Sequence, residues 1–117
     1  MNTLEKILAD GLDITAEAST DVLKLSNVIY VAVHIQTVGT IEGTASLEVA
    51  TGLNLDSNNE PTSWEELSSQ GIGTGGATHL WLDDNVPYTY LRVRFVPSSG
   101  TGTLKCLVSL KGDFPCR

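Results

Sequence analysis

The chain has 117 residues, of which 14 are acidic and seven are basic, and its formal charge is −7. This length accommodates one domain with one hydrophobic core, and a hydrophobic content of 41% is too high for a disordered chain. The negative charge repels phosphate backbones and anionic lipid headgroups, so we expect neither nucleic acid nor a membrane as a partner.

The N-terminal segment lacks the features of a targeting sequence. Its first residues have neither a basic region nor the apolar run of a secretion signal, and no stretch approaches roughly eighteen apolar residues. The sequence therefore predicts a protein used in the cytoplasm, or the mature form of a cleaved precursor. Between Thr3 and Ala9, Leu4, Ile7 and Leu8 could share one helical face, although a helix this short is marginal without packing. We expect residues 1–11 to form an N-terminal arm or a short helix.

After residue 11, apolar and polar residues alternate between clusters of Gly, Ser, Thr, Asn and Pro, a pattern typical of short strands joined by turns. Two short strands are expected within Leu12–Ala18 and Val22–Leu25. The strongest strand spans Val28–Thr37, and one face of it is predicted to carry Ile29, Val31, Val33 and Ile35. A glycine-bearing connection then leads to a strand through Ala45–Val49, which we expect to form an antiparallel hairpin with the preceding strand.

The second half of the chain continues in the same way. Asn54–Ser63 is dense in turn-forming residues and predicts a long surface loop, which a short strand or a turn pinned by Trp64 follows. Further strands are expected where Leu80 and Leu82 alternate with Trp81, and over Tyr88–Val96. In the latter strand, one set of side chains is predicted to face inward, namely Leu91, Val93 and Phe95. The other set is predicted to face outward, namely Tyr88, Tyr90, Arg92 and Arg94.

A final strand is expected in which Leu104, Cys106, Val108 and Leu110 share one face. In all, seven to eight short strands without intervening helices predict an all-β domain over residues 1–117, an antiparallel β-sandwich or jelly roll, with barrel closure as the open alternative. Residues 113–117 are expected to form a mobile tail.

Catalytic chemistry finds little support in the sequence. His34 and His79 lie in no nucleophile or metal motif, and Cys106 and Cys116 form no close-spaced ligand pair for zinc. We expect Cys106 to be a buried thiol, and a bridge between the two cysteines stays open. The sequence therefore predicts no catalytic residue, no cofactor and no metal.

Calcium is the metal that the sequence favours most. Asp56, Asn58 and Glu60 alternate oxygen ligands within the polar loop. The loop lacks the glycine and the distal glutamate of an EF-hand, so a solvated polar loop is the preferred interpretation. The glycine-rich run Gly71–Gly76 precedes no Lys-Ser or Lys-Thr pair and is expected to be a flexible connection.

Several strings resemble small β-sandwich structural proteins encoded by tailed bacteriophages. They are Tyr30–Thr37, Gly43–Val49, the loop with Trp64, Tyr90–Phe95 and Ser99–Leu104, and the resemblance covers roughly Leu12 to Gly112. Such proteins often carry a Ser-Asn-Asp-Gly-like turn shortly before the tryptophan, where this chain has the longer segment Leu55–Ser63. This departure leaves the role of the loop undetermined.

The resemblance implies a non-enzymatic virion structural protein, assembled in the host cytoplasm. Its expected role is capsid decoration or cement: it would bind the major capsid protein or other virion proteins on the outer capsid and stabilise contacts between capsomers, as a homo-oligomer such as a dimer or trimer. A tail, neck or fibre component is the alternative within this group. Interface residues are expected in the N-terminal segment and among aromatic and arginine side chains, namely Leu4, Ile7, Trp81, Tyr88, Tyr90, Arg92 and Arg94.

A carbohydrate-binding module is the alternative outside this group. Trp64, Trp81, Tyr88 and Tyr90 could stack on sugar rings if they were exposed on one platform. Arg92 and the neighbouring tyrosines would equally suit cation–π pairing within the sheet, which is a purely structural role.

Overall fold

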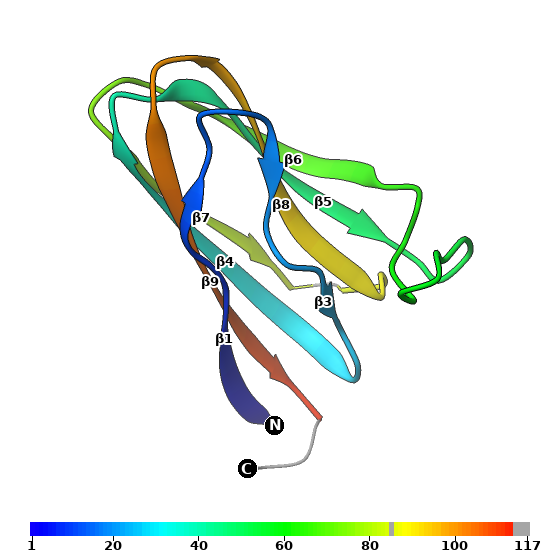
Figure 1. Ribbon diagram of the computed structural model, residues 1–117. Helices are drawn as coiled ribbons and strands as arrows, with labels where there is room; N and C mark the ends of the chain where they lie inside the picture. Colours follow the sequence, from blue (N-terminus) through cyan, green and yellow to red (C-terminus); the bar gives the residue numbers. More distant parts are fainter. Residues whose placement is uncertain (85, 114–117) are drawn as a thin grey trace.

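The computed structural model describes residues 1–84 and 86–113, and over this part of the chain it contains nine strands and no helix. None of these residues therefore forms a helix that could cross a membrane. The strands make two antiparallel sheets packed face to face (Figure 1), which confirms the predicted all-β sandwich. The four-stranded sheet has the order β1 (Asn2–Asp13), β9 (Gly102–Gly112), β4 (Val28–Gly39) and β7 (Ala77–Asp83). The five-stranded sheet has the order β2 (Ala18–Ser19), β8 (Tyr90–Ser99), β5 (Glu42–Ala50) and β6 (Glu65–Ile72), and β3 (Leu23–Lys24) also pairs with β8.

The N-terminal segment is an edge strand, so the short helix, one of the two alternatives for residues 1–11, is wrong. β1 pairs antiparallel with β9 from Asn2 opposite Gly112 to Asp13 opposite Thr103. The register of this pairing shifts between Ile7 and Ala9 and between Asp10 and Leu12, as it does at β-bulges. This pairing satisfies the backbone groups that face β9, whereas a helix of about two turns would have had little packing to support it.

The strands β4 and β5 do not form the predicted hairpin, because they lie in different sheets. β4 pairs with β9 and β7, whereas β5 pairs with β8 and β6. The connection between them carries the fully buried Ile41, which anchors the point where the chain crosses from one sheet to the other. The turn from β8 to β9 lies against this crossing: Gly100 has a φ of 85°, and a Cβ placed there would be 2.0 Å from the carbonyl oxygen of Thr40.

The core fills the space between the sheets. The four-stranded sheet contributes buried side chains including Val31, Val33, Ile35, Leu104, Cys106 and Val108. The five-stranded sheet contributes Ala45, Leu47, Leu91, Val93 and Phe95. These residues follow the predicted alternation, except that Ile29 is 38% exposed. An irregularity in the pairing of β4 with β9 between Val28 and Tyr30 shifts the phase of the strand there.

The predicted surface loop is present and is held by its own polar groups. Residues 51–60 are exposed, and Oδ1 of Asp56 accepts hydrogen bonds from the backbone N–H groups of Asn58 (2.8 Å) and Glu60 (3.1 Å). Nε1 of Trp64 donates to the carbonyl oxygen of Pro61 over 3.2 Å. The chain then enters β6, which extends into the glycine-rich run as far as Ile72. Of the predicted tail, residues 114–117 lie outside the described part of the chain.

Candidate interaction surface

In strand β7, a tryptophan faces the core and two leucines face solvent. Trp81 is buried between the sheets at 7% exposure, whereas Leu80 and Leu82 point away from the core and are 49% and 75% exposed. His79 and Asp83 share the face of Trp81, so the alternation in the sequence favours the two leucines as the inward side, and the structure reverses this expectation. Trp81 packs into the hydrophobic core between the two sheets.

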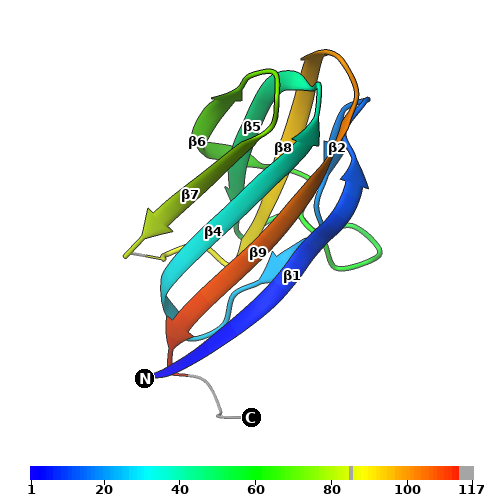
Figure 2. The same ribbon diagram turned by 90° about the vertical axis from the view of Figure 1, so that its left-hand side faces the viewer.

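The outer face of the four-stranded sheet, meaning the side chains that point away from the core, carries an apolar band. Cross-strand pairing aligns Ile7 with Leu107, Leu107 with His34, and His34 with Leu80. The next row contains Glu5, Ser109, Ala32 and Leu82. Tyr30 follows opposite Lys111 and is 41% exposed. Figure 2 shows this face with its four strands side by side.

Two shallow hollows open on this outer face. One, of about 340 Å³, lies around His34, Gln36, Lys105 and Ile7. The other, of about 550 Å³, lies between Tyr30 and Leu82, with Asp84 and Lys111 in its lining. Both are open depressions on a sheet rather than enclosed cavities, and their lining combines apolar side chains with a few charged groups. Such a surface suits contact with another macromolecule.

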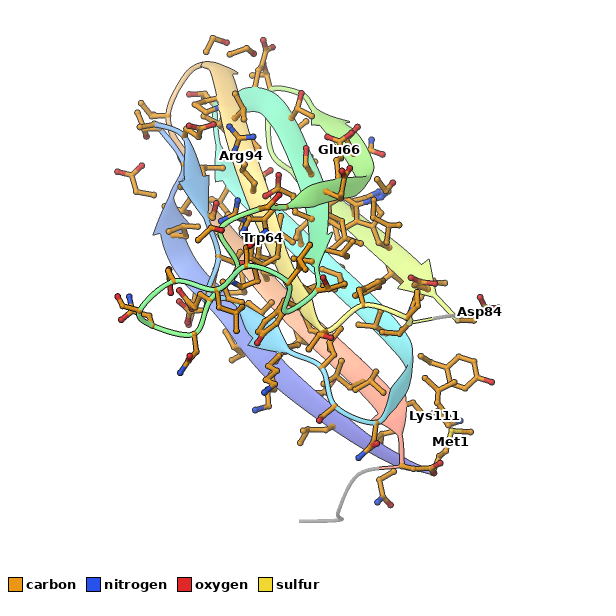
Figure 3. The ribbon with its side chains drawn as sticks, turned by 90° about the vertical axis from the view of Figure 1, so that its right-hand side faces the viewer. Met1, Trp64, Glu66, Asp84, Arg94 and Lys111 are labelled. Carbon is orange, nitrogen blue, oxygen red and sulfur yellow. The ribbon has the colours of Figure 1, made fainter. Side chains whose placement is uncertain are left out.

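The outer face of the five-stranded sheet differs because its ion pairs centre on a buried carboxylate, whereas the four-stranded sheet has the exposed pair of Lys105 with Asp10. Nε of Arg92 donates to Oε1 of Glu48 over 2.8 Å, and Arg94 contacts both Glu17 and Glu48. The guanidinium carbon of Arg92 lies 4.3 Å from the ring centroid of Trp64. The loop 51–63 and Trp64 lie over this sheet (Figure 3). A cation–π contact is therefore present, with Trp64 rather than the predicted tyrosines as its aromatic partner.

The predicted interface residues do not form one surface. Ile7 lies on the outer face of the four-stranded sheet and is 63% exposed, while Leu4 is partly buried opposite Leu110. Trp81 is in the core, and Arg92 and Arg94 lie on the other sheet with the partners given above. The interface role of these residues stays a prediction.

The predicted exposure of the two tyrosines is wrong. Tyr88 precedes β8 and packs into the hydrophobic core, and its hydroxyl donates to Oδ2 of Asp83 over 2.9 Å. Burial, together with Asp83, raises the pKa of Tyr88 above its usual value. Tyr90 keeps the outward phase of Arg92, but it is 6% exposed because the chain after β5 passes over it, with Gly52 near its ring.

Sequence reasoning missed the outer-face residues Tyr30, His34, Leu80, Leu82 and Leu107. A signal for them was present: on a half-exposed sheet the outward positions are expected to be polar, and here several of them are apolar on neighbouring strands. The register that aligns these positions depends on pairing between strands far apart in the sequence, which alternation alone does not give.

The described residues do not form a metal site. No group of three or more His, Cys, Asp or Glu side chains lies close enough to hold a metal within residues 1–84 and 86–113. Asp56, the first candidate calcium ligand, uses Oδ1 to accept backbone hydrogen bonds of its own loop. Cys106 is fully buried, and burial raises the pKa of its thiol to about 12. Its open pairing with Cys116 falls outside the described residues.

Comparisons with known proteins connect the fold to two solved structures. The chain aligns with "PBSX exported protein XepA" at 18% identity and a TM-score of 0.61, over 97% of this chain and 39% of that one, so it spans well under two thirds of XepA. It aligns with "SPBc2 prophage-derived protein YomS" at 15% identity and a TM-score of 0.55, over 92% of this chain and 93% of that one. Tobacco streak virus coat protein aligns at 10% identity and a TM-score of 0.42 over 99% of this chain and 90% of that one, a likeness too low to establish a shared fold.

The sequence itself matches no protein-family model and no curated protein. The two structural likenesses show that this β-sandwich also occurs in a protein of prophage origin, nearly over its full length. At these identities they show the fold alone.

Proposed function

We propose that this chain is a virion structural protein of a tailed bacteriophage, acting as a capsid decoration protein that binds the outer capsid and stabilises contacts between capsomers. The observation that carries the proposal is the contrast between the two faces of the sandwich. The five-stranded sheet pairs its arginines with its own glutamates, whereas the four-stranded sheet exposes the apolar band with Leu80, Leu82 and Tyr30. Exposed apolar area of this kind is stabilised when a partner covers it.

Two further observations support a phage context. The strings around Tyr30–Thr37 and Tyr90–Phe95 resemble small phage β-sandwich proteins, and the fold recurs in the prophage-derived YomS. The charge of −7 suits a protein on the exterior of a particle, where like-charged copies must stay soluble before they assemble. A decoration protein acts by burying surface at the seams between capsomers, so it needs no reaction centre.

The carbohydrate-binding alternative is less favoured by the geometry. It needs aromatic rings exposed together on one platform. Trp81, Tyr88 and Tyr90 are buried, and the guanidinium of Arg92 lies over Trp64. Of these four aromatic side chains, none is presented as a free stacking surface.

The test uses particles of the phage that encodes the chain. Deleting its coding sequence should yield heads that release DNA at a lower temperature, and adding the purified protein back should restore heat resistance at a fixed number of copies per capsomer. Leu82→Glu should abolish the restoration by placing a charge in the apolar band. The matched control is Leu67→Glu on β6, an exposed leucine of the other sheet.

Three other results would each contradict a different part of the proposal. Protein found by mass spectrometry in purified tails and absent from heads would overturn the decoration role in favour of the tail, neck or fibre alternative. Absence from all particle fractions would overturn the virion assignment itself. Equal loss of head binding for Leu82→Glu and Leu67→Glu would overturn the assignment of the outer face as the binding surface.

A further inference from the structure

The sandwich has free strand edges, and they differ in how well they are protected against pairing with another chain. Unprotected edges offer unpaired backbone N–H and C=O groups, and proteins block them with charges, bulges or short strands. The pairing of β1 with β9 has two register shifts, and β1 carries Glu5, Lys6 and Asp10. β6 begins with Glu65 and Glu66, and its pairing with β5 is irregular. β2 and β3 are two residues long each.

The edge of β7 has fewer of these protections, because its one acidic residue, Asp83, is its last residue. From Ala77 to Leu82 it carries no acidic residue, no lysine, no arginine and no proline, and its pairing with β4 runs without a register shift. Its other side has no strand partner among the described residues, and Figure 2 shows β7 at the margin of the four-stranded sheet. Leu80 and Leu82 are exposed along it. The edge combines accessible backbone with apolar side chains, which favours strand addition.

The sequence of β7 is complementary to itself in one antiparallel register. When Trp81 lies opposite Trp81 of a second copy, Leu80 lies opposite Leu82 in both halves of the pair. His79 then lies opposite Asp83, an imidazole facing a carboxylate. Sliding one copy of β7 by two residues in either direction would keep outward side chains opposite outward ones. It would separate the Leu80–Leu82 pairs and the His79–Asp83 pairs. This self-complementarity is what a two-fold interface requires, because the same patch serves both subunits.

We propose that a second copy of this chain pairs antiparallel along β7 about a two-fold axis at Trp81, joining the two four-stranded sheets into one continuous sheet. The outer faces of the two copies then form one apolar surface twice as wide, in which the row that ends at Leu80 continues into Leu82 and Ala32 of the second copy. This pairing rests on β7 alone and does not depend on the virion assignment.

A strand pair of this length buries less surface than a permanent dimer interface, so the dimer is expected to be weak and to depend on concentration. Sedimentation velocity over a concentration series on the purified full-length chain measures this directly. Leu80→Lys and Leu82→Lys should each raise the dissociation constant by about tenfold or more, since edge lysines oppose strand pairing. Leu67→Lys on β6 is the matched control and should leave the constant unchanged, with all three variants keeping the parent melting temperature within a few degrees.

The register has its own test. In a Cys116→Ser background, which removes the second native thiol of the sequence, Leu80→Cys protein mixed with Leu82→Cys protein should form a disulfide-linked dimer on mild oxidation, several-fold faster than either variant alone. Dominant self-crosslinking of Leu80→Cys would overturn the register. A strict monomer across the series, or a larger assembly whose mass the lysine variants do not change, would overturn the two-fold pairing.

Because these measurements use purified protein without capsids, their failure would leave the decoration role standing. Conversely, a β7 dimer whose protein is absent from particles would separate the dimer from the virion proposal.

Discussion

Glu48 and Arg92 lie directly opposite each other on the neighbouring strands β5 and β8, and Nε of Arg92 donates to Oε1 of Glu48 over 2.8 Å. Glu48 is 7% exposed, which is unusual for a carboxylate on the outer face of a sheet. It also lies within 4.0 Å of Arg94, so one carboxylate serves two guanidinium groups.

Removing this carboxylate should be more costly than removing an exposed one. We expect Glu48→Ala to lower the free energy of unfolding by roughly 1–3 kcal/mol, because it leaves the partly buried Arg92 without its partner. Glu17→Ala, which removes the exposed partner of Arg94, should cost less than about 1 kcal/mol. Urea unfolding at pH 7 measures both, and equal losses would contradict the central role of Glu48.

The hydroxyl of Tyr88 should contribute to stability in a way that depends on pH. Burial and Asp83 raise the pKa of Tyr88 above its usual value of 10.0, so the unfolded chain releases this proton first as the pH rises. The unfolded state then binds fewer protons than the folded state, and stability is lost above about pH 10. Tyr88→Phe should cost roughly 0.5–1.5 kcal/mol at pH 7 by removing the hydrogen bond, and should reduce the decline.

Urea unfolding of the parent and of Tyr88→Phe at pH 7, 9 and 11 tests this expectation. The difference in free energy between the two proteins should narrow from pH 9 to pH 11. A difference that stays constant over this range would show that Tyr88 does not titrate differently in the folded and unfolded states.

The thiol of Cys106 should not react with disulfide reagents while the protein is folded. Burial raises the pKa of its thiol to about 12, and the thiolate is the form that reacts with disulfide reagents. In a Cys116→Ser variant, we expect no reaction with Ellman's reagent over hours at pH 8 and full reaction in concentrated urea. Rapid labelling of the native variant would mean that the four-stranded sheet opens locally around β9.

Phe95 is the largest side chain in the fully buried set, and it fills the space between the sheets. Phe95→Ala should lower the free energy of unfolding by about 3–5 kcal/mol through lost burial and the cavity left behind. Its neighbour Val96 points outward at 42% exposure, and Val96→Ala should change stability by about 0.5 kcal/mol or less. Thermal unfolding followed by circular dichroism compares the two, and similar shifts in Tm would refute this assignment of faces.

Gly100 should resist substitution because it combines a φ of 85° with close backbone contact. A Cβ there would be 2.0 Å from the carbonyl oxygen of Thr40, so Gly100→Ala must displace the crossing between the sheets and should cost at least about 2 kcal/mol. Gly71→Ala is the control, since a Cβ at Gly71 meets nothing within 4 Å. Equal stability of the two variants in urea would show that the β8–β9 turn adapts freely.

Local sequence patterns were sufficient to predict part of the fold. Alternation placed Leu104, Cys106, Val108 and Leu110 on the buried side of β9, and the turn-forming composition of residues 54–63 indicated an exposed loop. Both signals are local, because the side-chain period of a strand and the conformational preferences of turn residues act over a few residues.

Other features of the fold depend on contacts between segments that are far apart in the sequence. The N-terminal segment becomes β1 because β9 supplies its hydrogen-bonding partners. The neighbouring strands β4 and β5 lie in different sheets, because β4 pairs with β9 and β5 pairs with β8. In β7, the alternation favours burial of Leu80 and Leu82, but the packing of the two sheets buries Trp81 instead. The exposed leucines on which both proposals depend follow from that choice, since burial is a property of the assembled layers and not of the strand alone.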